Sequence, residues 1–191
     1  NGGIFVNTCF SGMVDDTDLC FTGQSPLEDV LGIIQEEIDA PSEEFENQFT
    51  YGGSVYPAQY LCEIVHAKEN TEVLAVYEKD FYAGSPVVTR NSFGKGEAYY
   101  LAAESSLDFL RAFYQDLFRE AALENALQTK LPYGVTVTER VGDNGKRVVF
   151  VMNFKNEPVC VEGIGKWTDA ETKEVYEGTL EMKPFQCMIL I

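Results

Sequence analysis

Basic residues are scarce in this sequence and absent from its first third. The 191 residues include 14 Lys and Arg against 31 Asp and Glu, which gives a formal net charge of −17. Twelve of the acidic residues precede Lys68, the first basic residue. Nucleic acids and anionic membranes are bound through basic faces. The charge therefore predicts a protein with no nucleic-acid and no membrane partner. Its acidic stretch is either a solvated surface or faces a basic surface of a longer parent protein.

The sequence also lacks long apolar runs and an N-terminal leader. No run approaches the roughly 18 apolar residues of a transmembrane helix, and no basic-then-apolar segment follows Asn1. Because the chain does not begin with Met, we expect a processed or cut piece of a longer protein. Its length excludes a whole (β/α)₈ barrel, which typically needs about 250 residues. Hydrophobic residues at 45% and aromatic residues at 13% predict a folded core.

The cysteines do not form a recognisable framework. There are five of them, an odd number, and no CxxC pair occurs: Cys9, Cys20, Cys62, Cys160 and Cys187. This disfavours a disulfide scaffold and a zinc site. Three of them lie in apolar runs, where cysteine behaves as a small hydrophobic residue. We therefore expect free thiols in a reducing cytoplasm.

The first 130 residues mix strand and helix patterns. Strands are predicted at Ile4–Phe10, Tyr60–His66, Glu72–Tyr77, Val87–Arg90 and Glu97–Ala103, with a hairpin turn over residues 91–96. A short helix is expected at Leu27–Gly32 and an acidic loop at Glu36–Glu46. The best helical pattern covers Ser105–Ala121, with Ser105 and Asp108 resembling a capping box.

Beyond residue 131 the period of the apolar residues changes to two. Strands are predicted at Val135–Val141, Arg147–Phe154, Val159–Glu162, Val175–Tyr176 and Met182–Ile191, with a hairpin turn over residues 143–145. Short strands with close turns and no helix are typical of a small antiparallel β-sandwich. The sequence thus predicts an α/β domain over residues 1–130 and a β-sandwich domain over residues 131–191.

Two short motifs resemble ligand-binding loops but favour a structural interpretation. Gly94-Lys95-Gly96 lacks the Ser or Thr and the helix that follow the lysine of a phosphate-binding loop, so it is interpreted as a turn. Asp15, Asp16 and Asp18 could bind a hard cation, but their spacing is not that of a calcium loop. An ordinary acidic turn is therefore favoured.

Two further features resemble catalytic groups. His66 is the sole histidine, so a Cys-His or Ser-His mechanism would have to use it, and no GxSxG elbow marks a nucleophile. Asn156-Glu157-Pro158 matches a tripeptide that carries the acid/base glutamate in many retaining glycosidases. That chemistry needs a second carboxylate about 5–5.5 Å away. In a segment of short antiparallel strands the tripeptide is interpreted as a hairpin loop.

The stretch Phe81–Leu101 resembles the middle domain of the family 42 β-galactosidases, in which an FYAG-P-VTRN-FGKG-AYYL pattern recurs. Other segments resemble the same enzymes in the same order: NGG at residues 1–3, FSGMVD at 10–15, PLEDVLGI at 26–33, EVLAVY at 72–77, and the C-terminal β-domain at 150–154 and 156–159. The resemblance covers nearly the whole chain.

The resemblance implies a fold and a role. Enzymes of this family consist of a catalytic barrel, a Rossmann-like (class I amidotransferase-like) middle domain associated with trimerisation, and a small C-terminal β-sandwich. Both catalytic glutamates belong to the barrel. The resemblance therefore implies that this chain holds no catalytic, cofactor-binding or metal-binding residue and is inactive alone. It would be the assembly and support portion of a homotrimeric enzyme that hydrolyses terminal β-D-galactosides, with the parent's barrel as its partner.

Two other functions stay open at this stage. A carbohydrate-binding module would need exposed aromatic platforms, and Trp167 is the only tryptophan. A self-contained amidotransferase-like hydrolase would need Cys9 or Cys62 as its nucleophile, with His66 as the only possible histidine partner.

Overall fold

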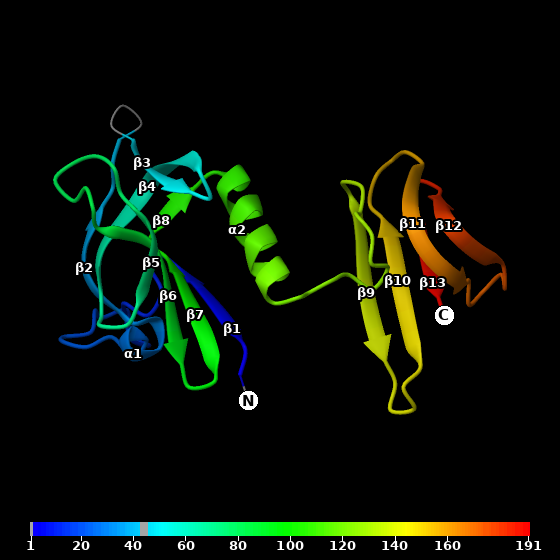
Figure 1. Ribbon diagram of the computed structural model, residues 1–191, viewed down its shortest axis with the longest axis horizontal. Helices are drawn as coiled ribbons and strands as arrows, with labels where there is room; N and C mark the ends of the chain where they lie inside the picture. Colours follow the sequence, from blue (N-terminus) through cyan, green and yellow to red (C-terminus); the bar gives the residue numbers. More distant parts are fainter. Residues whose placement is uncertain (1, 43–45) are drawn as a thin grey trace. The chain divides into compact units, whose positions relative to one another are not determined.

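The computed structural model describes residues 2–42 and 46–191, and the chain divides into two compact units (Figure 1). The first unit extends to Asp116 and mixes strands with helices, whereas the second runs from Leu117 to Ile191 and its sheets are antiparallel. This order of a mixed α/β part and an antiparallel part agrees with the prediction. Within the described ranges, no helix is both long and apolar enough to cross a membrane.

One sheet of the first unit has the strand order β1-β7-β6-β5. Its strands are β1 (Ile4–Thr8), β5 (Glu72–Val76), β6 (Pro86–Phe93) and β7 (Gly96–Leu101). β1 runs parallel to β7, whereas β6 pairs antiparallel with both β7 and β5. The turn between β6 and β7 contains Gly94, which adopts a φ of 62° that favours glycine. The predicted hairpin is thus confirmed.

The other sheet of the first unit is built around a long strand, β4. Its strands are β2 (Ile33–Asp39), β3 (Asn47–Tyr51), β4 (Ser54–Ala67) and β8 (Ala103–Ser105), in the order β2-β4-β3 with β8 also on β4. The predicted acidic loop Glu36–Glu46 is wrong at its start, because pairing with β4 holds Glu36 and Glu37 in a strand. Residues 43–45 of that segment lie outside the described residues.

Two helices lie beside these sheets. α1 (Glu28–Leu31) ends at Gly32, whose φ of 67° lets its N–H reach the Glu28 carbonyl. α2 (Leu107–Glu120) begins one residue later than predicted: Ser106, not Ser105, accepts a hydrogen bond from the Phe109 N–H, at 3.3 Å. Ser105 ends β8, and its hydroxyl donates to the Pro57 carbonyl instead. The predicted capping box of Ser105 and Asp108 is therefore wrong, and Ser106 caps the helix instead.

Aromatic packing joins the start of α2 to the strands. The Phe109 ring meets Phe49 edge-on at a centroid distance of 4.9 Å, and it also contacts Tyr51 and Tyr56. One turn later, Phe113 contacts Tyr99 of β7. Phe109, Phe113 and Leu117 are spaced by helical periodicity and buried. The apolar pattern of the helix predicts a packed face that includes Leu107 and Phe118, and this is wrong because both side chains are exposed.

The second unit contains two antiparallel sheets around one core. Their strands are β9 (Val135–Val141), β10 (Arg147–Asn153) and β13 (Cys187–Leu190) in one sheet, and β11 (Val159–Thr168) and β12 (Val175–Met182) in the other. The turn at residues 143–145 joins β9 to β10 as predicted. The core is apolar, and both sheets contribute to it: Leu127, Val135, Val149, Val151, Val161, Ile164, Leu180, Met182, Met188 and Leu190.

The predicted strand Met182–Ile191 is wrong. Met182 ends β12, a turn follows in which Phe185 has a φ of 52°, and Cys187 begins β13 in the other sheet. Both apolar ends of the run enter the shared core, and the turn lies between them at Lys183, Pro184 and Gln186. β11 and β12 extend beyond the predicted spans because they pair as one long, bulged hairpin.

Candidate functional sites

A buried carboxylate is the main polar feature of the first unit. Glu63 of β4 is only 1% exposed, although it lies in the apolar run Leu61 to Val65. Its carboxylate accepts the Tyr100 hydroxyl of β7 in a short hydrogen bond and the Phe10 N–H at 2.8 Å. Gln35 of β2 donates to the Tyr100 oxygen at 2.8 Å. Groups from both sheets and from the turn after β1 thus converge on one carboxylate.

The environment of Glu63 shows what this cluster can do. Burial raises the pKa of Glu63, and the hydrogen bonds from Tyr100 and Phe10 oppose the shift. Burial, together with the charge of Glu63, likewise raises the pKa of Tyr100. Glycoside hydrolysis needs a pair of carboxylates that a sugar can reach. A carboxylate without access to solvent instead positions the segments that it joins.

Cys9 and Cys62 lie near this cluster, but neither is activated. Burial raises the pKa of the Cys9 thiol to about 11, and the charges of Glu63 and Glu104 add to the shift. Burial also raises the pKa of Cys62 to about 11. A nucleophilic thiol requires a lowered pKa, because the thiolate is the reactive species. The environments of Cys9 and Cys62 therefore disfavour the thiolate, which is the opposite of what a nucleophilic cysteine needs.

The structure places His66 away from any thiol contact. Its Nε2 atom forms a short contact with the carboxylate of Glu36 on the neighbouring strand β2, and both side chains are exposed. This cross-strand pair follows from the β2–β4 register, in which His66 lies opposite Ile34. His66 is thus a surface histidine that pairs with a carboxylate across two strands.

Asp15 closes a turn by accepting hydrogen bonds on the carboxylate oxygen that a cation would otherwise coordinate. One oxygen of its carboxylate accepts the Thr17 N–H at 2.8 Å, the Thr17 hydroxyl at 2.7 Å and the Leu19 N–H at 3.2 Å. These bonds lower the pKa of Asp15. In the part of the chain that the structure describes, no group of three or more His, Cys, Asp or Glu side chains could hold a metal ion.

Gly94-Lys95-Gly96 is a tight turn against the N-terminal segment. A Cβ atom on Gly96 would lie 2.5 Å from the Gly3 carbonyl oxygen, so only glycine fits there. The Glu97 N–H also donates to that oxygen, at 2.9 Å. Close packing of the backbone explains the glycine at position 96 without a phosphate.

Asn156-Glu157-Pro158 connects two different sheets. β10 and β11 do not pair with each other, so the predicted hairpin loop is wrong and the tripeptide is an inter-sheet connection. Glu157 forms a short ion pair with Lys155. Its carbonyl accepts the Asn153 side-chain N–H at 2.9 Å, which holds the connection against β10. These contacts give the tripeptide a structural role.

Trp167 is not an open platform. The guanidinium of Arg147 lies 5.9 Å from the centre of its ring, within the range of a cation–π contact. The ring is half-buried against the core of the second unit. A sugar could not stack on this face without displacing the arginine.

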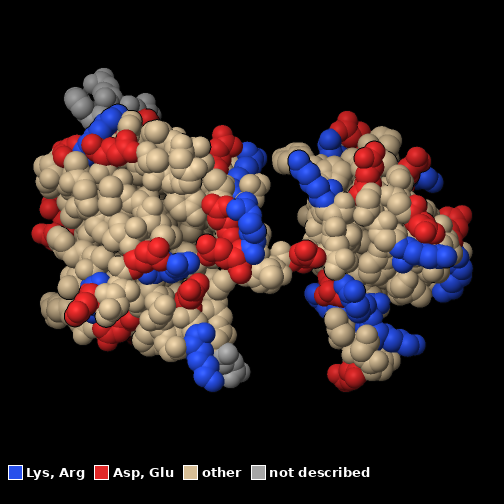
Figure 2. Space-filling view, in the orientation of Figure 1, with Lys and Arg blue, Asp and Glu red and all other residues tan. Residues whose placement is uncertain are grey.

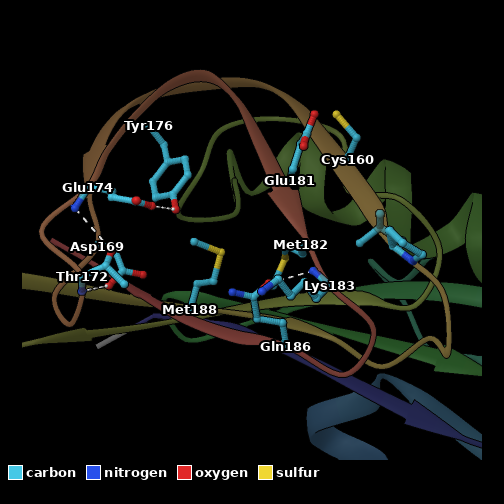
Figure 3. A pocket seen from close by; sticks show the side chains of 12 residues that line it. Cys160, Asp169, Thr172, Glu174, Tyr176, Glu181, Met182, Lys183, Gln186 and Met188 are labelled. Atoms are coloured by element: carbon cyan, nitrogen blue, oxygen red, sulfur yellow. Dashed lines mark hydrogen bonds between the residues drawn. The ribbon is translucent and has the colours of Figure 1, made fainter.

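A cavity of about 640 Å³ opens in the second unit, between β11, β12 and the turn before β13 (Figure 3). Its floor is formed by the buried side chains of Met182 and Met188. The Tyr176 ring faces the interior, and its hydroxyl donates to Glu174 at 2.8 Å, which raises the pKa of Tyr176. Sequence reasoning missed this cavity, because its residues come from three separate segments.

The charges that line the cavity bear on which ligands it could bind. Three carboxylates, Asp169, Glu174 and Glu181, and one cation, Lys183, are among the residues that line it. Asp169 accepts the N–H groups of residues 171 and 172, and these bonds lower its pKa and fix the adjacent turn. An acidic wall disfavours anionic ligands. The Tyr176 ring, the two buried methionine thioethers and several acceptors suit an uncharged ligand with hydroxyl groups.

Comparison with known families accounts for the whole arrangement. Residues 1–124 match the family described as the β-galactosidase trimerisation domain, and residues 134–190 match the β-galactosidase C-terminal domain. The chain belongs to the family 42 β-galactosidases. The two matches follow each other in the order of the resembling segments along the chain, so the predicted resemblance is confirmed.

Individual members of the family agree with this assignment. The chain is 38% identical over 200 residues to β-galactosidase Pbg of Clostridium perfringens and 40% identical over 199 residues to β-galactosidase BgaA of a Planococcus species. Both alignments cover 100% of this chain and 29% of the relative. The chain thus spans less than a third of the length of these curated relatives.

Solved structures of the family share the fold. The β-galactosidase of Bacillus circulans sp. alkalophilus superposes with a TM-score of 0.84 at 38% identity, over 99% of this chain and 29% of that one. The cold-adapted enzyme of Rahnella sp. R3 gives a TM-score of 0.82 at 37% identity, over 99% of this chain and 28% of that one. The arrangement of elements described above is therefore shared with these enzymes over 28–29% of their length.

Proposed function

We propose that this chain is the non-catalytic assembly and support portion of a β-galactosidase that hydrolyses terminal β-D-galactosides. The observation that carries the proposal is that trimerisation and C-terminal domains occupy the whole chain, which spans only 29% of its relatives. The catalytic barrel with its two glutamates would then lie outside these residues. Among the carboxylates considered above, Glu63 is sealed from solvent and Glu157 is paired with Lys155, so neither is arranged for hydrolysis.

The proposed partners are the parent's own barrel and two further copies of the chain. We place the domain boundary at residues 130/131 and assign a Rossmann-like, class I amidotransferase-like architecture to the first domain and a β-sandwich to the second. The strand β1 supports the Rossmann-like assignment of the first domain, because it pairs in parallel with β7. Its Ile4 and Phe5 side chains are exposed. Five free cysteines support a reducing, cytoplasmic location.

An amidotransferase-like hydrolase has little support. The raised pKa values of Cys9 and Cys62 oppose thiolate formation, and His66 is occupied by Glu36. Nothing in this arrangement activates a nucleophile.

Carbohydrate binding by the second unit is the second candidate, and the cavity of Figure 3 favours it. The Tyr176 ring, held by Glu174, offers an apolar face, and the acidic wall offers acceptors for sugar hydroxyls. Calorimetry with galactose, lactose and a β-galactan oligosaccharide tests this candidate. Heat that saturates and is lost in Tyr176→Ala, but kept in the exposed-residue control Tyr133→Ala, would support it. No heat at millimolar sugar would exclude it.

Assembly is tested by light scattering of the 191-residue chain over a salt series. The net charge of −17 opposes self-association, and salt screens this repulsion over a Debye length of about 10 Å at 0.1 M and about 3 Å at 1 M. We expect weak association that strengthens with salt, with the trimer as the favoured species. A strict monomer in high salt at high protein concentration would show that the barrel, and not this chain, holds the trimer together.

A further inference from the structure

The strand β10 is apolar on both of its faces. In the run from Val148 to Phe154, Asn153 is the one polar residue. Val149 and Val151 belong to the buried core of the second unit. Successive side chains of a strand point to opposite faces, so the other face carries the residues between them, which are partly exposed: Val148, Phe150 and Met152. A nearly continuous apolar run is typical of a strand that is covered on both sides.

The neighbouring strands extend this outward face of β10. The register places Phe150 opposite Ile189 of β13 on one side and opposite Thr138 of β9 on the other. Phe154, just beyond the end of β10, is 62% exposed. Figure 2 shows Lys, Arg, Asp and Glu side chains gathered toward the two ends of β9 and β10. We name the apolar surface between them the β10–β13 face, which consists of Val148, Phe150, Met152, Phe154, Cys187 and Ile189.

The other sheet of the second unit has an ordinary outward face. Its outward positions are exposed and mostly polar: Cys160, Glu162, Thr179 and Glu181. Its inward positions, such as Val161 and Leu180, belong to the core. An antiparallel sheet with one face in the core and the other in water has this alternation. The β10–β13 face therefore departs from the pattern that its own domain follows elsewhere, and contiguous apolar surface of this kind marks an interaction site.

The dimensions of the β10–β13 face fit one α-helix. Neighbouring strands lie about 4.8 Å apart, so two strands make a band about 10 Å wide, close to the 10–12 Å diameter of a helix with its side chains. From Val148 to Phe154 the strand advances by about 20 Å, which is the length of about 13 helical residues. The short side chains of Thr136 and Thr138 border the band on β9. A helix with an apolar stripe is stable when that stripe is buried on such a sheet.

The helix that fits this face comes from outside the chain. In residues 2–42 and 46–191, α2 is the one helix with more than four residues. Its buried side chains, Phe109 and Phe113, already pack against Phe49 and Tyr99 of the first unit. Residues 134–190, which hold the face, match the C-terminal domain, whereas the trimerisation domain matches residues 1–124. This separation disfavours a second copy as the occupant.

We propose that the β10–β13 face binds an amphipathic helix of the parent's catalytic barrel. This inference rests on the proposed function, which places a barrel in the part of the parent outside these residues. The chain covers only 29% of the length of its relative Pbg, so most of such a parent is available as a partner. A (β/α)₈ barrel carries its helices as an outer ring and therefore presents them to neighbouring domains. The contact gives the support role of the second unit a location.

Cross-linking of the full-length parent tests this contact. A photoreactive benzoylphenylalanine replaces Phe150, and in a matched control it replaces Thr179 on the outward face of the other sheet. We expect irradiation to join position 150 to a barrel helix of the same chain, in at least tenfold higher yield than position 179. Gel mass separates links within one chain from links between copies, and peptide mapping identifies the site. Links to residues 1–130, links to another copy, or equal yields from the two positions would overturn the proposal.

A matched pair of substitutions gives a second test. We expect Phe150→Glu in the parent to raise the rate of tryptic cleavage after Lys130 at least tenfold, because the second unit is no longer held by the barrel. Thr179→Glu places the same charge on the control face and should leave the rate unchanged. Circular dichroism checks folding, and Met152→Gln is a milder change at the same face. Unchanged cleavage in the folded variants of the β10–β13 face would overturn the proposal.

Hydrolysis of an aryl β-galactoside by the unmodified parent separates this contact from the proposed function. An active parent that gives none of the expected cross-links would overturn the contact alone. A parent that does not hydrolyse the substrate would overturn the proposed function instead.

Discussion

Glu63 accepts a short hydrogen bond from the hydroxyl of Tyr100 inside the first unit, and both side chains are buried. The pair joins β4 of one sheet to β7 of the other. The same carboxylate accepts the Phe10 N–H, so one ionisable group links the two sheets and the turn that follows β1. Its protonation must therefore influence the stability of the unit.

The first prediction is that Glu63 makes the stability of the first unit fall as the pH rises. Since its pKa is raised, the folded chain binds this proton more tightly than the unfolded chain does. The associated stability is complete below the unfolded pKa of about 4.3 and is lost as the pH rises through the folded pKa, by up to about 1.4 kcal/mol per pH unit. Glu63→Gln should flatten this slope.

Urea unfolding between pH 4 and pH 8 measures that slope, and hydrogen exchange of peptides from the first unit is used to monitor the unfolding. Glu69→Gln is the control, because Glu69 is exposed in a turn. An unchanged slope in Glu63→Gln would contradict the account of the cluster.

The second prediction concerns the packing of α2. Phe109 is buried among four aromatic rings, so Phe109→Ala leaves a cavity and should lower the free energy of unfolding of the first unit by about 3–5 kcal/mol. Leu107→Ala, on the exposed side of the same helix, should change it by less than about 0.5 kcal/mol. Urea unfolding of the two variants measures both changes. Equal losses of stability would mean that the helix packs through another face.

Strands with a clear apolar pattern and turn residues beside them could be predicted from the sequence, whereas strands that begin with polar residues could not. The hairpin of β6 and β7 was predictable because the turn residues Gly94 and Gly96 lie between two runs of strand-forming residues, Val87 to Thr89 and Ala98 to Leu101. β3 was missed because Asn47 and Gln48 open it with polar side chains. The structure satisfies Asn47 by hydrogen bonds to both backbone groups of Lys79, which come from a distant segment. No local pattern contains that information.

The polar cluster was missed for a related reason. Glu63 interrupts an apolar run, and a lone acid in such a run could have indicated a buried group with a partner. Its partners Tyr100 and Gln35 lie 37 and 28 positions away, so only the fold brings them together. The structural interpretation of the turn at Gly94 needed only local chemistry.

The third prediction is that Cys9 reacts slowly although it is partly accessible. With a pKa of about 11, against an ordinary value of 9.0, it holds roughly a hundredfold less thiolate near pH 8. Iodoacetamide labelling followed by mass spectrometry should modify the exposed Cys20, Cys160 and Cys187 first, then Cys9, and Cys62 last. Labelling of Cys9 ahead of these exposed thiols would indicate an activated nucleophile and revive the hydrolase alternative.

The fourth prediction locates the proposed domain boundary. Lys130 is the only Lys or Arg between Arg119 and Arg140, and it lies in the segment that joins α2 to β9. Brief trypsin treatment should cut first after Lys130 and give fragments of residues 1–130 and 131–191, because linkers between domains open most readily. Mass spectrometry identifies the fragments. A first cut after Arg111, inside α2, would show that the helix is not a stable part of the first domain.

The most direct test of the central claim is an assay of the 191-residue chain beside its full-length parent on an aryl β-galactoside. Without the barrel and its paired carboxylates, the chain at high protein concentration should give no turnover above a buffer blank, whereas the parent hydrolyses the substrate. Turnover by the chain alone, abolished by Glu157→Gln, would contradict the account and give the Asn156-Glu157-Pro158 connection a catalytic role.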